Sequence, residues 1–303
     1  MNLRHLIVSR IQSSKKAVLA VAVAEDAEVL SAVTQAMKLN LVEAILVGHE
    51  EEIRKVAGIH GLDLRGATLI HEPDPVLACE GAVKLVSSGK ADLLMKGLVD
   101  TSVLLKAVLN KDWGLRTDHL LSHVTVFTVP NHERLFFMSD GAMNIAPDVM
   151  AKKQIIENVL PVTRALGLSH PKVAVVCAVE KVNPKMQATL DAQALSDMAK
   201  AGEIVGCDVD GPFAMDNAIS IEAAHHKGIT NVNAGRADVL LMPNIEAGNI
   251  LYKAMTFLSN GTVACVISGA QAPIVLTSRA DDDDAKLNSI ALAVLMTQEK
   301  AHG

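Results

Sequence analysis

A serine and an arginine stand side by side at Ser278–Arg279, directly after the aliphatic run PIVLT and shortly before four aspartates at 281–284. A guanidinium offers a fork of donors that matches phosphate or carboxylate oxygens, and it stays charged at any working pH. A neighbouring hydroxyl can donate a further hydrogen bond, and the N-terminus of a following helix would add unpaired N–H groups. The segment is therefore a candidate site for phosphoryl oxygens. The alternative is a surface arginine paired with one of the aspartates.

The four aspartates also have two interpretations. At the start of a helix they favour the dipole, and most of them would serve as caps or lie in solvent. Packed together they would repel an anionic substrate, so we expect at most one to face a cleft as a general base. Four consecutive acids are not a spacing typical of a divalent-metal site, and we expect no metal.

Three further loops carry polar residues after aliphatic runs: KGLVDTS (96–102), SDGAMN (139–144) and PNIEAGN (243–249). Each is a weak signal alone, because lysines near a helix start are often solvated and a glycine in a strand-to-helix turn needs no ligand. We expect His225 and His226 to lie in an exposed turn. The candidate substrate-binding residues from these loops and the helix after the first are Lys96, Thr101, Lys106, Asn144, Glu246, Gly248 and Asn249.

The elements that must position these loops alternate along the chain. Strand-like runs at 15–23, 42–48, 67–72 and 91–97 are each followed by a helix-like segment, and 123–140 reads as a hairpin. A long helix is predicted to begin near Pro147 and Asp148. From 172 the alternation resumes, ending in a helix over about 284–300. This order predicts an open α/β fold with right-handed crossovers, whose ligands bind at the carboxyl ends of strands.

Composition excludes several classes. The chain has 303 residues, enough for about two domains, and is 50% hydrophobic but only 2% aromatic. An aliphatic core of this kind suits helices on a buried parallel sheet. The net charge is −6 and the basic residues are scattered, so nucleic-acid binding is not expected.

The chain also lacks the patterns of membrane, disulfide and nucleotide-binding proteins. No apolar stretch reaches ~18 residues and no signal-peptide layout is present, which indicates a cytoplasmic protein with no membrane partner. Cys79, Cys177, Cys207 and Cys265 are far apart and are expected to be reduced and buried. GxGxxG, HExxH and GxSxG are absent, and Gly89–Lys90 lacks the rest of a P-loop.

Four segments together resemble the phosphate acetyltransferase and butyryltransferase family. They run in order from about 95 to 296, and the EAGN turn and the Ser-Arg step are their most specific elements. The segments are MKGLVDTSVLLKAVL, DVDGPFAMDNAISIEAAHHKGI, AGRADVLLMPNIEAGNILYK and APIVLTSRADDDDAKLNSIALA.

The resemblance implies two open α/β domains with a cleft between them, similar to the isocitrate and isopropylmalate dehydrogenase fold. The C-terminal segment would return to the first domain, giving 1–145 plus 266–303 and, as the second domain, 146–265. It further implies a homodimer that uses coenzyme A and phosphate as substrates, with no tightly bound cofactor. The thiol would attack an acyl phosphate directly, or phosphate would attack the thioester in reverse.

Carried over residue by residue, Ser278 would orient the reacting atoms, Arg279 would bind phosphate, and an aspartate would take the thiol proton. In the acetyl-type pattern that aspartate lies seven residues after the serine, where this chain has Ala285. We therefore expect Asp284 to be the base, with Asp283 as second candidate. Lys106 replaces an arginine of that pattern, which keeps the charge but loses the fork.

Two other functions remain open at this point. One is a non-catalytic acyl-CoA-sensing module; the other is a hydroxy-acid dehydrogenase of related fold, which would need metal-ligating aspartates and a nicotinamide loop. Within the family, DGPFAMDNAIS, PIVLTSRA and KLNSIALA look closer to the butyryl branch, since the acetyl branch tends to have glycine where Ala280 stands. We expect butyryl to be preferred and acetyl to be possible.

Overall fold

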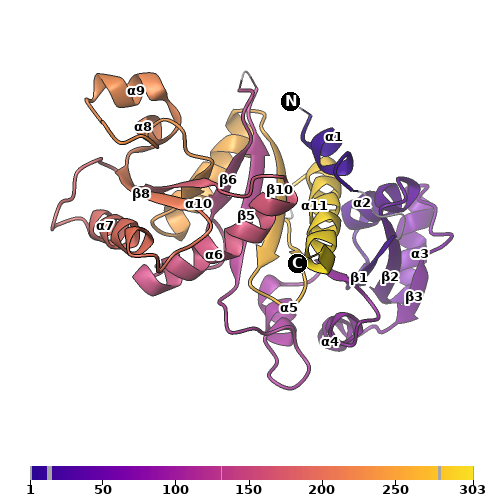
Figure 1. Cartoon of the computed structure of the whole chain (residues 1–303). Helices are drawn as coiled ribbons and strands as arrows, with labels where there is room; N and C mark the ends of the chain where they lie inside the picture. The colour runs from indigo at the N-terminus through magenta and orange to yellow at the C-terminus, as the bar shows by residue number, and fades with distance from the viewer. Residues whose placement is uncertain (1, 12–15, 131, 279–280, 303) are drawn as a thin grey trace. The chain divides into compact units, whose positions relative to one another are not determined.

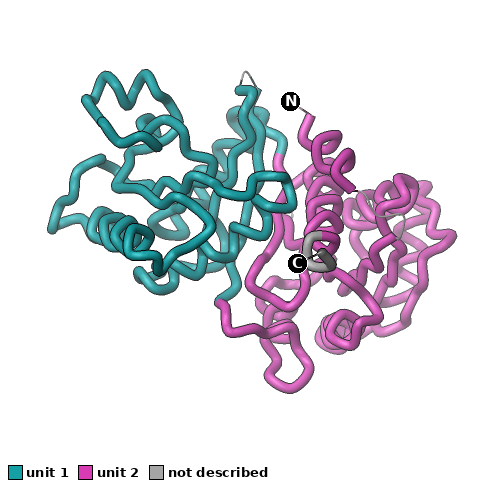
Figure 2. The backbone as a smooth tube through the Cα atoms, viewed as in Figure 1, with its two compact units in different colours: residues 1, 120–262 teal, residues 2–119, 263–303 magenta. Residues whose placement is uncertain are grey.

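The computed structural model describes residues 2–11, 16–130, 132–278 and 281–302 (Figure 1). The chain forms two compact units, shown in separate colours in Figure 2. Unit 1 is continuous and runs from Leu120 to Thr262. Unit 2 is discontinuous, because it combines Asn2–His119 with Val263–Gly303.

The sheet of unit 2 has the strand order β3-β2-β1-β4-β11-β10. Its strands are β1 (Ala17–Ala22), β2 (Val42–Gly48), β3 (Thr68–His71), β4 (Leu93–Lys96), β10 (Thr262–Ser268) and β11 (Ile274–Val275). The first five in this order run parallel, and β10 is antiparallel to β11. β4 is buried along its whole length and β1 at all but one position, which explains their continuous aliphatic sequences.

The helices of unit 2 form two groups around this sheet. The chain moves from β1 to β2 to β3 in one direction and returns to β4 on the other side, so right-handed crossovers place α4 on the face opposite α2 and α3. α11 packs against α2 and contacts α1, while α4 contacts α5. The helices are α1 (Leu3–Val8), α2 (Ala27–Lys38), α3 (Glu50–Ile59), α4 (Pro75–Ser87), α5 (Thr101–Val108) and α11 (Asp283–His302).

The sheet of unit 1 has the strand order β5-β6-β9-β7-β8. Its strands are β5 (Ser122–Thr128), β6 (Phe136–Ser139), β7 (Lys172–Val176), β8 (Asp208–Phe213) and β9 (Val239–Leu241). β5 and β6 pair antiparallel, which confirms the hairpin predicted at 123–140. β6, β9, β7 and β8 run parallel to one another.

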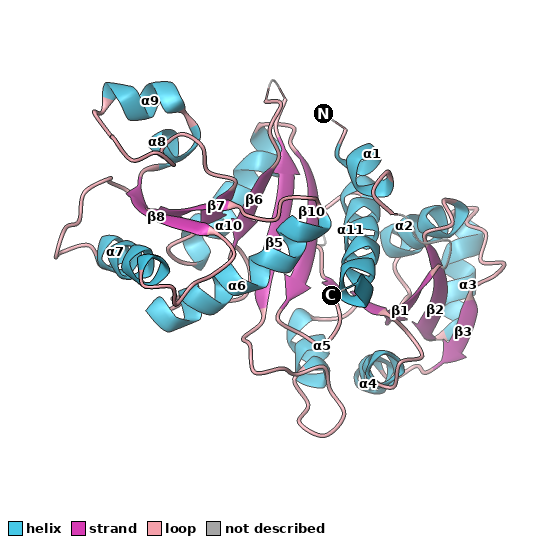
Figure 3. Cartoon of the chain, in the orientation of Figure 1, coloured by secondary structure: helices cyan, strands magenta, loops and turns pink. Residues whose placement is uncertain are grey.

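The helices of unit 1 alternate with these strands (Figure 3). The predicted helix near Asp148 is confirmed, because α6 begins at the next residue, Val149. Asp148 is its N-cap, and its carboxylate accepts a hydrogen bond from the amide of Ala151 at 2.8 Å. His225 and His226 are exposed, as expected, but they lie in the last turn of the helix α9 and not in a turn between elements. The helices are α6 (Val149–Ala165), α7 (Gln187–Lys200), α8 (Met215–Ile219), α9 (Ile221–His226), α10 (Ile245–Lys253) and the π-helical turn η1 (Ala254–Leu258).

The predicted open α/β class is confirmed, with parallel strands and intervening helices in both units. Along the chain, the boundaries between the two compact units fall after residues 119 and 262. The predicted domain boundaries fall after residues 145 and 265. The two divisions differ mainly over 120–145. This stretch belongs to unit 1 because β6 pairs with β9 within that sheet.

Two general expectations can also be compared with the described residues. None of their helices is both long enough and apolar enough to span a membrane. The four cysteines are buried and form no disulfide.

Candidate active site

The carboxyl edge of the unit 2 sheet brings three strand ends together. β1 and β4 are parallel neighbours, and β11 runs parallel to β4 on its other side, so all three end at the same edge. The chain leaves β1 toward β2 but reaches β4 on the opposite side, so the strand order reverses between β1 and β4. Ligands of open α/β sheets bind at such a reversal. Two of the four loops selected from the sequence, KGLVDTS and the turn at Ser278, lie at this edge.

The ends of β1 and β4 are held in direct main-chain contact. The amide of Leu98 donates to the carbonyl of Val23 at 2.7 Å, and a Cβ added to Gly97 would lie 2.0 Å from the same oxygen. Val23 has φ 57°, a left-handed conformation that a β-branched residue rarely adopts. Such strain persists only where the surroundings fix it, and it gathers at functional sites. Gly97 is therefore required by this close approach.

Lys96 turns back onto its own loop instead of toward solvent. The side chain is buried, and its ammonium donates to the carbonyl oxygens of Gly97 at 3.1 Å and Val99 at 3.0 Å. Thr101 is the first residue of α5 and is partly exposed, while Lys106 is exposed in the last turn. A rise of 1.5 Å per residue places their Cα atoms about 7.5 Å apart along the helix axis. Lys96 is therefore directed into its own loop, whereas Thr101 and Lys106 are at least partly exposed on α5.

The turn after β11 is closed by two reciprocal hydrogen bonds. The amide of Ser278 donates to Oδ2 of Asp281 at 2.7 Å, and the amide of Asp281 donates to the carbonyl of Ser278 at 3.1 Å. Asp281 is buried, while Ser278 is partly exposed. Arg279, predicted to bind phosphate, lies outside the described residues. Ser278 and Asp281, the described residues on either side of it, are thus fixed at the carboxyl edge of the sheet.

The four consecutive aspartates have four different environments. Asp281 is buried in the turn, and Asp282 caps the amide of Ala285 at 2.8 Å. Asp283 accepts a hydrogen bond from the Ser31 hydroxyl at 2.5 Å. Asp284 has a 68% exposed side chain that pairs with Arg4 at 2.5 Å. Of the two residues considered as a general base, Asp284 is therefore the more accessible to a ligand.

The other two selected loops lie together in unit 1, at the ends of the parallel strands β6 and β9. Asp140 is buried after β6, and its carboxylate accepts main-chain hydrogen bonds from Ala142, Met143 and Asn144 at 2.8, 3.0 and 3.2 Å. The Asn144 amide adds a bond to Asp140 at 2.5 Å and another to the Leu121 carbonyl at 3.0 Å. Asn144 thus shapes its own loop.

The PNIEAGN loop packs against this structure. A Cβ on Gly248 would lie 2.3 Å from the carbonyl oxygen of Asp140 and 2.8 Å from the Cα of Gly141. The Asn249 amide donates to the Gly141 carbonyl at 3.2 Å. Glu246 is exposed in the first turn of α10. The segment is helical from Ile245, so Gly248 lies within α10 and is explained by close packing of this helix against the loop after β6, a contact that needs no ligand.

Two residues that hold these loops were not selected from the sequence. Asp140 could have been found, because an aspartate followed by glycine after a strand often bonds the main chain two or three residues on. Lys286 is a buried lysine that bonds the turn after β11, and no local pattern distinguishes it from a surface lysine. In the described part of the chain, no group of three or more His, Cys, Asp or Glu side chains is arranged to hold a metal ion.

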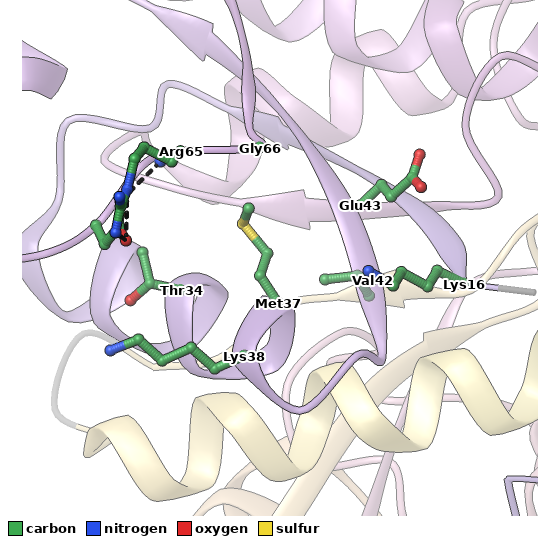
Figure 4. A pocket seen from close by; sticks show the side chains of 9 residues that line it. Lys16, Thr34, Met37, Lys38, Val42, Glu43, Arg65 and Gly66 are labelled. Atoms are coloured by element: carbon green, nitrogen blue, oxygen red, sulfur yellow. Dashed lines mark hydrogen bonds and ion pairs between the residues drawn. The ribbon is translucent and has the colours of Figure 1, made fainter.

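A cavity of about 340 Å³ lies at the opposite, amino edge of the unit 2 sheet (Figure 4). The Arg65 guanidinium binds the Asp63 carboxylate at 2.6 Å and lowers its pKa to about 2. None of the residues selected from the sequence contributes to this cavity, so it is separate from the candidate active site. Its lining comprises Lys16, Thr34, Met37, Lys38, Val42, Glu43, Asp63, Arg65 and Gly66.

Sequence comparison finds the same relationship along almost the entire chain. The profile of the phosphate acetyl/butaryl transferase family matches residues 2–76 and 74–294. A phosphate butyryltransferase of Clostridium acetobutylicum is 48% identical over 97% of this chain and 98% of its own length. A phosphate acetyltransferase of Thermotoga maritima is 45% identical over 91% of this chain and 94% of its own length.

Solved structures give a concordant result. A branched-chain phosphotransacylase from Enterococcus faecalis V583 superposes with a TM-score of 0.83 at 32% identity, covering 93% of this chain and 99% of that one. A putative 4-hydroxythreonine-4-phosphate dehydrogenase from Salmonella typhimurium superposes with a TM-score of 0.58 at 14% identity, covering 93% of this chain and 100% of that one. The second likeness concerns the fold alone, which is the dehydrogenase-like α/β fold expected from the sequence.

Proposed function

Because the chain belongs to the phosphate acetyl/butyryl transferase family, we propose that it transfers a short acyl group reversibly between coenzyme A and inorganic phosphate. The observation that carries the proposal is the 48% identity with a phosphate butyryltransferase over 97% of this chain. The position of Ser278 supports it, because the serine lies three residues after β11, a parallel neighbour of β4 at the sheet edge where the strand order reverses and α/β enzymes bind ligands.

The proposed chemistry is direct transfer between the two substrates. A thiol has a pKa of ~8.5 and is only partly ionised near neutrality, so a base within hydrogen-bond reach increases the thiolate fraction. We assign this role to Asp284, with Asp283 as second candidate. Arg279 stabilises the charge that develops on the departing phosphate, and Ser278 orients the reacting oxygens.

The remaining candidates divide by what their side chains contact. Thr101, Lys106 and Glu246 are at least partly exposed and are proposed to contact substrate directly. The side chains of Lys96, Asn144 and Asn249 bond loop carbonyls, and Gly248 packs against a loop, so these residues act on substrate through loop shape.

Butyryl is the proposed preferred acyl group, with acetyl accepted more slowly. If the acyl pocket buries two more methylenes at ~0.8 kcal/mol each, the preference is ~1.6 kcal/mol, or roughly fifteenfold in kcat/KM. Branched four- and five-carbon acyl groups are also proposed substrates, because the similar Enterococcus faecalis protein is a branched-chain phosphotransacylase. A rate maximum at acetyl-CoA, measured at one phosphate concentration, would assign the chain to the acetyl branch.

The decisive assay mixes the purified protein with butyryl-CoA and phosphate and measures acyl phosphate together with free thiol. Both should appear in equal amounts, and initial rates should give intersecting lines when both substrates are varied. Parallel lines, or acyl label retained on denatured protein, would contradict direct transfer. Acyl-CoA binding without turnover would instead identify the sensing module, and reduction of a nicotinamide by a hydroxy acid would identify the dehydrogenase.

We further propose a cytoplasmic homodimer that works without a metal or a tightly bound cofactor. Sedimentation equilibrium measures the oligomeric state. Activity that survives dialysis against a chelator, with no metal found by elemental analysis, is the expected outcome for the second part. Loss of activity that a divalent metal restores would overturn it.

A further inference from the structure

Lys286 is a buried cation next to the turn that carries Ser278. Its side chain is 4% exposed, although it lies in the first turn of α11, two residues after the exposed Asp284. A buried ammonium is costly unless other groups satisfy it. Its Nζ donates to the main-chain carbonyl of Asp281 and to Oε2 of Glu28 at 2.6 Å.

These two partners connect the ends of two strands. Asp281 is the residue whose carboxylate and amide close the turn onto Ser278. Glu28 lies in the first turn of α2, which follows β1. One ammonium therefore links the turn after β11 to the helix after β1. Both elements begin at the carboxyl edge of the unit 2 sheet.

We propose that Lys286 is a positioning residue for phosphate acyl transfer: its ammonium holds Asp281, whose hydrogen bonds fix Ser278 after β11, without touching substrate itself. The inference rests on the proposed function. It adds the requirement that Ser278 be held in position, because a misplacement of reacting groups by about 1 Å can lower the rate ~10²-fold.

A second buried lysine that forms an ion pair among the described residues, Lys152, offers a matched control. The Lys152 side chain is 3% exposed, and its Nζ lies 2.5 Å from Oδ2 of Asp191. This pair joins α6 to α7 within unit 1 and holds no strand-end turn of unit 2. Loss of either lysine should lower stability, but only the loss of Lys286 should move the turn at Ser278.

The test compares Lys286→Met, Lys286→Arg and Lys152→Met with the wild type. Methionine keeps an apolar stem and removes the ammonium, so Lys286→Met should lower kcat ~10–100-fold with KM for butyryl-CoA nearly unchanged. Arginine keeps the charge and donors and should restore most of kcat. Lys152→Met should lower Tm while kcat at a permissive temperature stays within about threefold.

Hydrogen exchange supplies a readout that general destabilisation does not move. The amides of Ser278 and Asp281 should exchange faster in Lys286→Met but at the wild-type rate in Lys152→Met. Unchanged kcat in folded Lys286→Met, beside an active wild type, overturns the inference and leaves the proposed function standing. Equal losses of kcat in both lysine variants overturn it as well, because the effect is then one of stability.

If the wild-type protein forms no acyl phosphate, both the proposed function and the positioning role of Lys286 are contradicted. If Lys286→Met does not fold, Glu28→Gln makes the same test from the exposed side of the contact. It should lower kcat several-fold and speed exchange at Ser278. Wild-type values of both would overturn the inference.

Discussion

The loop after β6 in unit 1 and the turn after β11 in unit 2 use their polar residues differently. In unit 1 the loop after β6 packs against α10, with Asn144 and Asn249 bonded to main-chain carbonyls and Gly248 in close contact with the carbonyl of Asp140. In unit 2 the turn after β11 is closed by Asp281, but the same run also presents the exposed carboxylate of Asp284. A polar residue at a strand end is thus a candidate for chemistry only when loop folding leaves its side chain accessible.

The sharpest test of this comparison replaces the aspartates singly by asparagine. Asp284→Asn should lower kcat/KM by ~10²–10⁴, the usual contribution of a general base, while Tm changes little because its ion pair with Arg4 is exposed. Asp281→Asn should instead lower Tm, because it weakens a buried turn. Steady-state rates and thermal melts separate the two. Four equally mild losses would mean that the run is only a helix cap and a solvated face.

Arg279→Ala should lower kcat/KM by at least ~10², the scale of one lost transition-state donor. Arg65→Ala is the control, since that guanidinium is 91% exposed and binds Asp63 at the amino edge of the sheet. Its activity should stay within about threefold of wild type. A folded Arg279→Ala with wild-type rates, checked by circular dichroism, would remove this arginine from the mechanism.

A smaller effect on stability is expected in unit 1. Gly248→Ala places a Cβ 2.3 Å from the Asp140 carbonyl, and should lower the free energy of unfolding by ~1–3 kcal/mol, the usual cost of overpacking. Gly58→Ala, in helix α3 with no atom within 4 Å of the new Cβ, should be neutral or stabilising by ~0.5–1 kcal/mol. Denaturant unfolding measures both. An inactive Gly248→Ala with wild-type stability would indicate that the glycine approaches a ligand.

The smallest difference between the two units is predicted for their cysteine thiols, because burial has the same effect on thiol pKa in both. Burial raises the pKa of Cys79 in unit 2, and of Cys177 and Cys207 in unit 1, to about 11. Because the folded state holds these protons more tightly, their contribution to stability is complete below pH ~9 and is lost as the pH rises toward ~11. At pH 8 these thiols should react with a disulfide reagent only after denaturation. Rapid reaction in the native state would contradict their burial.

The sequence predicts elements best where the hydrophobic pattern is continuous. β1, β2 and β4 are aliphatic runs, and each was expected within a few residues of its observed bounds. β8 was missed because DVDGPF contains two aspartates, a glycine and a proline, which together resemble a turn. The strand forms because it lies at the edge of its sheet and pairs only with β7, where proline is tolerated. The helices α8 and α9 have five and six residues, too few for a clear period.

The site was predictable in its location but not in its side-chain directions. The order of the strands is enough to place Ser278 at a carboxyl edge. Nothing in four identical aspartates tells which is buried, because the answer depends on partners such as Arg4 and Ser31, more than 250 residues away in sequence. Lys96 shows the same limit, since only the folded loop reveals that its donors point at carbonyls of its own segment.

The discontinuity of unit 2 has a consequence for protein synthesis. Unit 1 is one uninterrupted stretch, and its last residue is translated before β11 and α11. Until those elements arrive, β4 lacks the neighbour it has in the finished sheet, and its aliphatic flank is available to chaperones or to other nascent chains. Ser278 lies between these last elements, so a ribosome that stalls before them leaves a chain that has the complete sequence of unit 1 and no serine–arginine step.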